Sequence, residues 1–266
     1  MQKPIITLLS DFGLRDPYVA EMKAVILCTC PDAQIVGISH EIARFEVRMG
    51  AFVLASATPY FPKCTVHVAV VDPDVGTRRR PIVVETRHSL FVGPDNGLLM
   101  LAAEREGMKH VHVISNTDFM LRRVSKTFHG RDAFAPVAAH LANGRLPSEV
   151  GPKITDYALP EFAKPTIKGS SLVGEILHID DFGNIVTNIS TKELKSINAK
   201  KGDFLLVKLN GKTSKLKYCS AYGDVKINEL LAVVAGHGFL EISLNQGNAS
   251  EKLNAKAGMR ISIRRT

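Results

Sequence analysis

The spacing of apolar residues changes near residue 160, and this change most constrains the fold. Before it, short β-rich runs alternate with stretches whose apolar residues recur every three or four positions, a pattern typical of helices between parallel strands. After it, short strand-like runs follow one another with few helices between them, as in a small antiparallel barrel. We therefore expect an α/β domain with a largely parallel central sheet at residues 1–160, a Pro- and Gly-rich linker at 161–170, and an antiparallel β-barrel domain at 171–266.

The expected elements follow from the same periodicity. In the first domain, strands are predicted at 5–10, 34–38, 65–71, 82–85, 90–92 and 111–114. Asp16 and Pro17 suit the start of the first helix, a second helix runs toward Pro59, and others lie near 98–105 and from about 131 to 141. In the second domain, strands are predicted at 172–179, 185–189, 204–209, 214–218, 230–235, 239–243 and 259–263.

Composition excludes several classes of protein. The net charge is +8, but the lysines are spread over the C-terminal third with hardly any aromatic residues between them, so we expect no nucleic-acid partner. The four cysteines form no CxxC pair, which indicates neither a zinc site nor a disulfide scaffold. No apolar run reaches the roughly 18 residues of a membrane span, and the start MQKPIITLLSDFG lacks a signal-peptide pattern. We expect a cytoplasmic protein without a membrane partner.

Three loops of the first domain carry side chains suited to acid–base chemistry. Asp11 follows the first strand, where it could face a ligand crevice and bind a ribose diol or merely cap a turn. In VVDPDVGTRRR, Asp72 follows a buried strand and precedes the arginines 78–80; the alternative here is a solvated turn with a weak ion pair. In FHGRD, His129 precedes a helix. A histidine, a carboxylate and a guanidinium together could orient and polarise one water.

The barrel half contains one further motif, IDDFGNIVTNI. It has the pattern of a strand, an acidic Gly-containing turn and a second strand, which a simple hairpin explains. A binding role would use Asp180 for a cationic amine, Phe182 as a stacking surface and the amide of Asn184 for a purine edge. The residues alone leave both interpretations open.

Five segments in chain order, SDFGLRDPYV, VVDPDVGT with Arg79, GPDNGLL, FHGRDAFAPVAAHLA and IDDFGNIVTNI, resemble the S-adenosyl-L-methionine (SAM) hydroxide adenosyltransferase family, as does FLEISLNQGNASEKL near the end. These hydrolases are related to fluorinase and chlorinase. The resemblance implies an N-terminal α/β domain, a C-terminal β-barrel and a homotrimer with active sites at subunit interfaces. It further implies hydrolysis of SAM to adenosine and L-methionine, by attack of an activated water on ribose C5′ without a metal or cofactor.

The resemblance also assigns roles to residues of this chain. Asp72, Arg79 and His129 match the water-activating set, and Asp11 matches the ribose-binding aspartate. The other implied substrate contacts are Asp16, Tyr18 and Asp180 around the methionine part, Asn184 at the adenine with Phe182 beside it, and Gly236, Glu241 and Leu244 at the nucleoside.

Two positions depart from the family pattern, and a third distinguishes fluorinase-like members from the others. Asp74 stands where glycine is usual, which reduces backbone freedom in the catalytic turn, and Gly236 stands where a small hydroxyl residue is common. Fluorinase-like members carry tyrosine where this chain has Asp72, which favours water over halide as the nucleophile. The alternatives are a halogenase-like SAM enzyme, a non-catalytic protein that binds adenosine or SAM, and a basic RNA-binding protein.

Overall fold

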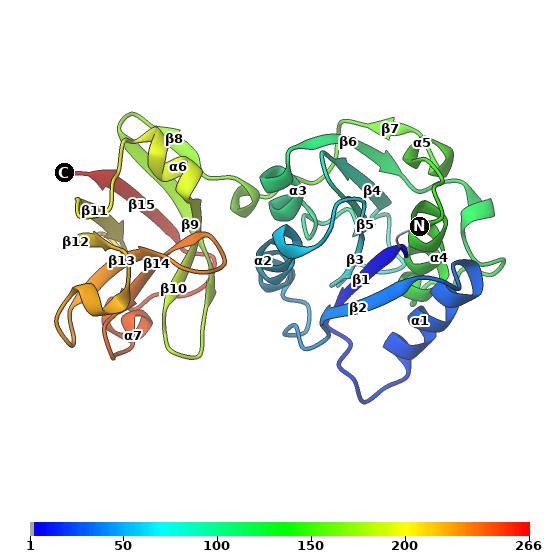
Figure 1. Ribbon diagram of the computed structural model, residues 1–266, viewed down its shortest axis with the longest axis horizontal. Helices are drawn as coiled ribbons and strands as arrows, with labels where there is room; N and C mark the ends of the chain where they lie inside the picture. The colour runs from blue at the N-terminus through cyan, green and yellow to red at the C-terminus, as the bar shows by residue number, and fades with distance from the viewer. Residues whose placement is uncertain (1–2) are drawn as a thin grey trace. The chain divides into compact units, whose positions relative to one another are not determined.

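The computed structural model describes residues 3–266, and the chain divides into two compact units. The first unit ends at Leu159 and the second begins at Pro160. The first is an α/β unit around a mostly parallel sheet, and the second is a closed β-barrel (Figure 1). The fold class expected from the sequence is therefore confirmed.

Seven strands form the sheet of the first unit, in the order β2-β1-β3-β5-β4-β6-β7. Their bounds are β1 Ile5–Ser10, β2 Gln34–Ser39, β3 Val66–Val70, β4 Pro81–Thr86, β5 Leu90–Pro94, β6 Met108–Val113 and β7 Lys153–Ile154. β1 pairs in parallel with β2 and β3, and β3 pairs in parallel with β5. In contrast, β4 and β7 are antiparallel to their neighbours. Because β1 and β3 are adjacent and parallel, the loops that follow them lie at the same edge of the sheet.

Helices cover both faces of this sheet (Figure 1). α1 (Tyr18–Thr29) and α4 (Ala135–Ala142) share one core with the strands, in which Met22, Ile26 and Val137 are buried beside Ile6 and Val68. α2 (Val47–Ala57) and α3 (Met100–Glu106) pack together on the opposite face. The shorter helices are η1 (Thr58–Tyr60), η2 (Thr117–Phe119), η3 (Gly130–Phe134, a π-helix that runs into α4) and α5 (Pro147–Val150).

Seven strands close the barrel of the second unit, in the order β10-β14-β13-β12-β11-β15-β9, and β9 pairs again with β10. The strands of the barrel are β9 Ser171–Ile179, β10 Ile185–Ser190, β11 Phe204–Leu209, β12 Lys212–Cys219, β13 Leu230–Val234, β14 Phe239–Leu244 and β15 Arg260–Arg265. The edge strand β8 (Thr166–Lys168) pairs with β9 outside this closed order. The connections contain α6 (Thr191–Ser196), η5 (Tyr222–Asp224) and α7 (Ala249–Leu253). Alternate residues of these strands point inward, so Leu205, Val207 and Leu209 of β11 are buried in the barrel core.

One pairing departs from the antiparallel barrel expected from the sequence. β12 pairs in parallel with β13, with Lys217 opposite Leu231 and Cys219 opposite Val233. Parallel neighbours need a crossover connection rather than a tight hairpin. Here the segment that contains η5 supplies it, and the barrel is mixed.

The segment 161–170, expected as a linker, belongs to the second unit. It contains η4 (Glu161–Ala163) and β8, which pairs antiparallel with the start of β9. All three residues of β8 are exposed, so this edge strand lacks the apolar alternation by which a strand is identified in a sequence.

Two further observations concern the environment of the chain. Within residues 3–266, no helix is long and apolar enough to cross a membrane. The cysteines, Cys28, Cys30, Cys64 and Cys219, are all free thiols.

Candidate active site

The loops after β1 and β3 and the start of η3 meet around one pocket of about 380 Å³ in the first unit, called here the acidic pocket. Its lining includes five side chains predicted from the sequence, Asp11, Asp16, Tyr18, Asp72 and His129. The sixth, Arg79, bonds to two of them. The parallel strand order therefore brings together residues that are up to 118 positions apart in the chain, counted from Asp11 to His129.

Asp72 and Arg79 form a buried, bidentate ion pair. Arg79 Nε donates to Asp72 Oδ1 at 2.9 Å, and Nη2 donates to Asp72 Oδ2. The two side chains are only 5% and 6% exposed, and the guanidinium lies over the ring of Phe134, 5.3 Å from its centroid. Among the described residues, Arg79 Nη1 is buried without a hydrogen-bond partner. The bidentate hydrogen bonds fix the orientation of the two side chains relative to each other.

His129 is hydrogen-bonded to the same guanidinium. Arg79 Nη2 lies 3.0 Å from His129 Nδ1. Because an arginine can only donate, Nδ1 must accept, and the ring proton is therefore on Nε2. Burial, together with the nearby charge of Arg79, lowers the pKa of His129. The ring is thus neutral at neutral pH and presents an N–H donor at its other nitrogen.

Asp11 is held in place by the loop that follows β2. Its Oδ2 accepts a hydrogen bond of 3.0 Å from the backbone N–H of Phe45. The two loops are joined twice more: a 2.8 Å hydrogen bond links Ser10 Oγ to His40 Nδ1, and Gly13 N donates to the carbonyl of His40 at 2.7 Å. Ser10 and His40 are both buried. The position of Asp11 therefore depends on His40, which the sequence does not mark as a site residue.

Three aromatic rings, those of Phe12, Tyr18 and Phe128, line the acidic pocket together. Their centroids are 5.2 to 5.7 Å apart. The sequence predicts Tyr18 but neither phenylalanine, although each directly adjoins a candidate residue in the chain. Gly130 leaves room for this cluster, because a methyl group there would lie 3.3 Å from the ring of Phe128 and 3.5 Å from that of Phe12.

Asp74, the extra carboxylate of the Asp72 turn, is exposed and is not part of the pocket lining. Its carbonyl accepts hydrogen bonds from the backbone and side chain of Thr77. The glycine that this turn requires is Gly76, which has φ +78° and whose added Cβ would lie 2.4 Å from the carbonyl oxygen of Lys126. Asp74 therefore occupies a position that tolerates a side chain.

The second unit has a pocket of its own, of about 650 Å³, called here the barrel pocket. The predicted residues Asp180, Phe182, Asn184 and Leu244 line it. Asp180 Oδ1 accepts from the backbone N–H groups of Phe182 and Asn184, at 3.0 and 2.8 Å, and Oδ2 accepts from the side-chain amide of Asn184 at 2.9 Å. These bonds orient the carboxamide of Asn184, and Phe182 projects with 80% of its surface exposed.

Glu241 and Gly236, also predicted as nucleoside contacts, are absent from the lining of the barrel pocket. Glu241 is buried and accepts from Tyr222 Oη at 2.8 Å, while His237 Nε2 lies 2.8 Å from its other oxygen. Tyr222 does line the pocket, and its burial, followed by its hydrogen bond to Glu241, raises its pKa. The sequence does not predict Tyr222, because it meets Glu241 only through the crossover connection.

Within residues 3–266, no three His, Cys, Asp or Glu side chains are grouped so as to hold a metal ion. The two pockets are lined by carboxylates, amides and aromatic rings, which suit a small polar molecule with aromatic and cationic parts. The class defined by this fold and these sites is a two-domain protein, α/β followed by mixed barrel, with a small-molecule site.

Comparison with known protein families identifies the family to which the chain belongs. The N-terminal domain of SAM hydroxide adenosyltransferases matches residues 6–151, and the C-terminal domain of the same family matches residues 174–262. The chain belongs to the SAM hydroxide adenosyltransferase family, and the resemblance drawn from the sequence motifs is confirmed.

Several relatives align over almost their full length. The (R)-S-adenosyl-L-methionine hydrolase of Methanocaldococcus jannaschii is 39% identical over 260 residues, covering 94% of this chain and 92% of the relative. A fluorinase of an Actinoplanes species is 28% identical, covering 98% and 97%. Among solved structures, an uncharacterized conserved protein of Thermotoga maritima is 40% identical with a TM-score of 0.83, covering 98% of this chain and all of that one.

Proposed function

We propose that the protein hydrolyses SAM to adenosine and L-methionine. The observation that carries this proposal is the buried cluster of Asp72, Arg79 and His129 at the acidic pocket, in a chain 39% identical to a protein named as a SAM hydrolase. The cluster supplies an acceptor and a neutral N–H donor on one rigid guanidinium, which are the two groups needed to orient a water.

The reaction is a direct displacement at ribose C5′. The oxygen of a water forms the new bond to C5′, the bond from C5′ to the sulfonium sulfur breaks, and its electron pair stays on sulfur as the neutral thioether of methionine. The water loses one proton, so that the 5′-hydroxyl of adenosine is formed with inversion at carbon. Because the sulfonium is a good leaving group, the protein has mainly to position the nucleophile in line.

The cluster divides this task among its members. Asp72 is the hydrogen-bond acceptor, and receives the proton of the water or directs it to solvent. His129 donates from Nε2 to the oxygen that is gaining bonds, while Arg79 compensates the buried charge of Asp72 and fixes the orientation of the His129 ring. From the sequence, His129 is expected to accept a hydrogen bond from the water or to take its proton; in this proposal it donates instead, because its Nδ1 is bonded to Arg79.

The remaining site residues bind the substrate in this proposal. Asp11 holds the ribose diol, and Asp16 and Tyr18 face the methionine part. In the barrel pocket, Asn184 uses its side-chain N–H for Asp180, which leaves its carbonyl oxygen to accept from the amino group of adenine beside Phe182. Leu244 contacts the nucleoside, whereas Glu241 acts through Tyr222. Gly236 remains a proposed backbone neighbour of the nucleoside.

We also propose a homotrimer, in which the acidic pocket of one subunit and the barrel pocket of a neighbour enclose one substrate. This arrangement is supported by the residues proposed for the ribose and for the adenine, which line two separate pockets. The free thiols support a reducing compartment such as the cytoplasm. No cofactor takes part.

The test is turnover in oxygen-18 water. The expected result is stoichiometric adenosine and methionine, with the label in the 5′-hydroxyl of adenosine. Asp72→Asn should lower turnover by ~10²-fold or more, whereas the matched control Asp74→Asn, on the same turn but outside the pocket, should keep the wild-type rate. Unlabelled adenosine, or equal rates for the two variants, would contradict the mechanism.

Halogenation of the same carbon is the second candidate, because fluorinases are among the relatives. The carboxylate of Asp72 at the pocket repels a halide, which favours water. Formation of 5′-halo-adenosine at high chloride or fluoride would reverse this preference, and tight binding of SAM without any product would instead identify a binding protein.

A further inference from the structure

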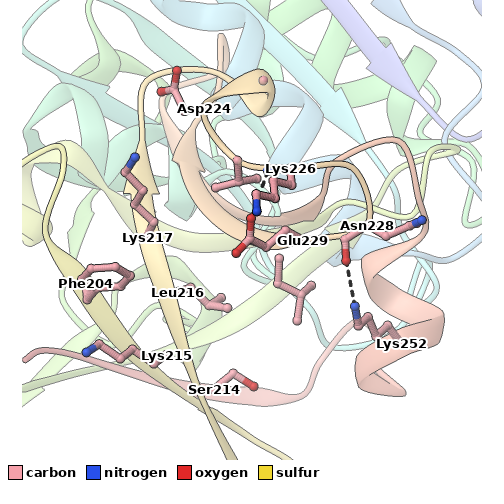
Figure 2. Close-up of a pocket in the computed structure, with 13 residues that line it drawn as sticks. Phe204, Ser214, Lys215, Leu216, Lys217, Asp224, Lys226, Asn228, Glu229 and Lys252 are labelled. Atoms are coloured by element: carbon pink, nitrogen blue, oxygen red, sulfur yellow. Dashed lines mark hydrogen bonds between the residues drawn. The ribbon is translucent and has the colours of Figure 1, made fainter.

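A second cavity of the barrel unit has a character unlike that of the substrate pockets. This cavity, the lysine groove, has a volume of about 840 Å³. Four lysines line it, Lys215 and Lys217 on β12, Lys226 before β13 and Lys252 on α7 (Figure 2). It includes none of the residues assigned above to catalysis or substrate binding, so its chemistry needs its own explanation.

Separate parts of the chain place these lysines around one space. Lys215 and Lys217 are two residues apart on β12 and therefore point to the same side of the strand, next to Phe204 of the paired strand (Figure 2). Lys252 reaches in from α7, where its Nζ donates to the carbonyl of Asn228 at 3.1 Å. Leu216, Val225 and Leu230 also contribute to the lining of the groove.

The groove carries more positive than negative charge, because four lysines and two carboxylates line it. Within residues 3–266, none of the four lysines forms an ion pair with a carboxylate. The two carboxylates of the groove are bonded to backbone N–H groups: Asp224 accepts from Ser220 and Ala221, and Glu229 accepts from Lys226. Four lysines less two carboxylates leave this concave surface with a net charge of +2, which attracts a multivalent anion.

We propose that the lysine groove binds the polyphosphate group of a small molecule. Lysine ammonium groups are compact point charges that suit phosphate oxygens, and the volume is in the range of small-ligand sites. Single-stranded nucleic acid fits less well, because it needs several exposed rings on which bases stack. Phe204 is the aromatic residue of the groove, and the ammonium of Lys215 lies 4.6 Å from its ring centroid.

The experiment is calorimetric titration of the full-length protein with sodium triphosphate at low ionic strength. Lys217→Gln/Lys226→Gln should weaken binding about tenfold or more, since two charge-assisted contacts are lost. The matched control Lys192→Gln/Lys195→Gln removes the same charge from α6, outside the groove, and should bind like the wild type. ATP in place of triphosphate distinguishes the source: equal affinity indicates recognition of the phosphates alone, and tighter binding indicates a nucleotide.

Three results would overturn the proposal. These are the absence of triphosphate binding to the wild type, an equal loss in the two double variants, and single-stranded RNA binding more tightly than triphosphate. Circular dichroism of each variant verifies that the barrel is folded. Because the titration contains no SAM, its outcome is independent of the proposed hydrolase activity.

Discussion

Replacement of Arg79 by methionine should destabilise the first unit strongly, because it leaves Asp72 as an uncompensated buried charge. Methionine is unbranched and apolar like the stem of arginine, but it has no donors. Asp72 is 5% exposed and loses both bonds from the guanidinium. Breaking a buried ion pair on one side typically costs about 3–5 kcal/mol, a large part of a typical unfolding free energy of roughly 5–15 kcal/mol.

Urea unfolding followed by far-ultraviolet circular dichroism measures this cost, since the chain has no tryptophan to serve as a fluorescent probe. Asp72 and Arg79 both belong to the first of the two compact units, so the loss is expected in the unfolding of that unit.

The double variant Asp72→Asn/Arg79→Met provides the decisive comparison. It removes both charges, so its unfolding free energy should lie closer to that of the wild type than to that of Arg79→Met. The reasoning is refuted if Arg79→Met costs less than about 1 kcal/mol, the value typical of an exposed pair. Additive losses in the double variant would refute it as well.

Three further predictions concern other positions. Burial lowers the pKa of His67 to about 3 from 6.5. The contribution of the neutral ring to stability is therefore complete above pH 6.5 and is lost as the pH falls toward 3, so the free energy of unfolding measured in urea should be ~2–3 kcal/mol lower at about pH 4 than at about pH 6. The variant His67→Leu should flatten this pH profile. Gly183→Ala should raise the KM for SAM and lower the unfolding temperature, since Gly183 has φ +80° and its Cβ would lie 2.1 Å from Asn248 Oδ1; unchanged values of both would contradict the strain. His40→Ala should raise the KM several-fold with kcat nearly kept, because it frees the loop that carries Asp11; in steady-state kinetics, a fall in kcat alone would argue against a positioning role.

The sequence predicts those parts of the site that follow strongly apolar strands. β1 and β3 are buried on both faces, so their runs are evident, and the residues at their ends can be placed at one sheet edge. The sequence pattern does not identify the arginine of the site, because Arg78, Arg79 and Arg80 are equivalent by spacing. In the structure, Arg78 is exposed and Arg80 pairs with Asp95 and Asp156. Family resemblance, rather than periodicity, selects Arg79.

Features that depend on distant contacts are not predictable from local pattern. The hydrogen bond between Ser10 and His40 spans 30 positions, and the one between Tyr222 and Glu241 spans 19. The edge strand β8 has no buried residue. The parallel pairing of β12 with β13 depends on a crossover, whereas each strand taken alone fits an antiparallel barrel equally well.

The π-helix Gly130–Phe134 has a consequence for how the site could be altered. Each π-turn closes its hydrogen bond over five residues rather than four, so η3 contains in effect one residue more than an α-helix would in that stretch. Because the wider π-turn completes about the same rotation with one residue more, deleting one residue there would leave His129 facing about the same way relative to α4. A deletion within α4 itself would instead rotate the residues on one side of it by about 100° relative to the other. The π-turn thus absorbs one residue of chain length between the histidine and the core helix, so the direction in which His129 faces Arg79 is less sensitive to insertion or deletion here than within α4.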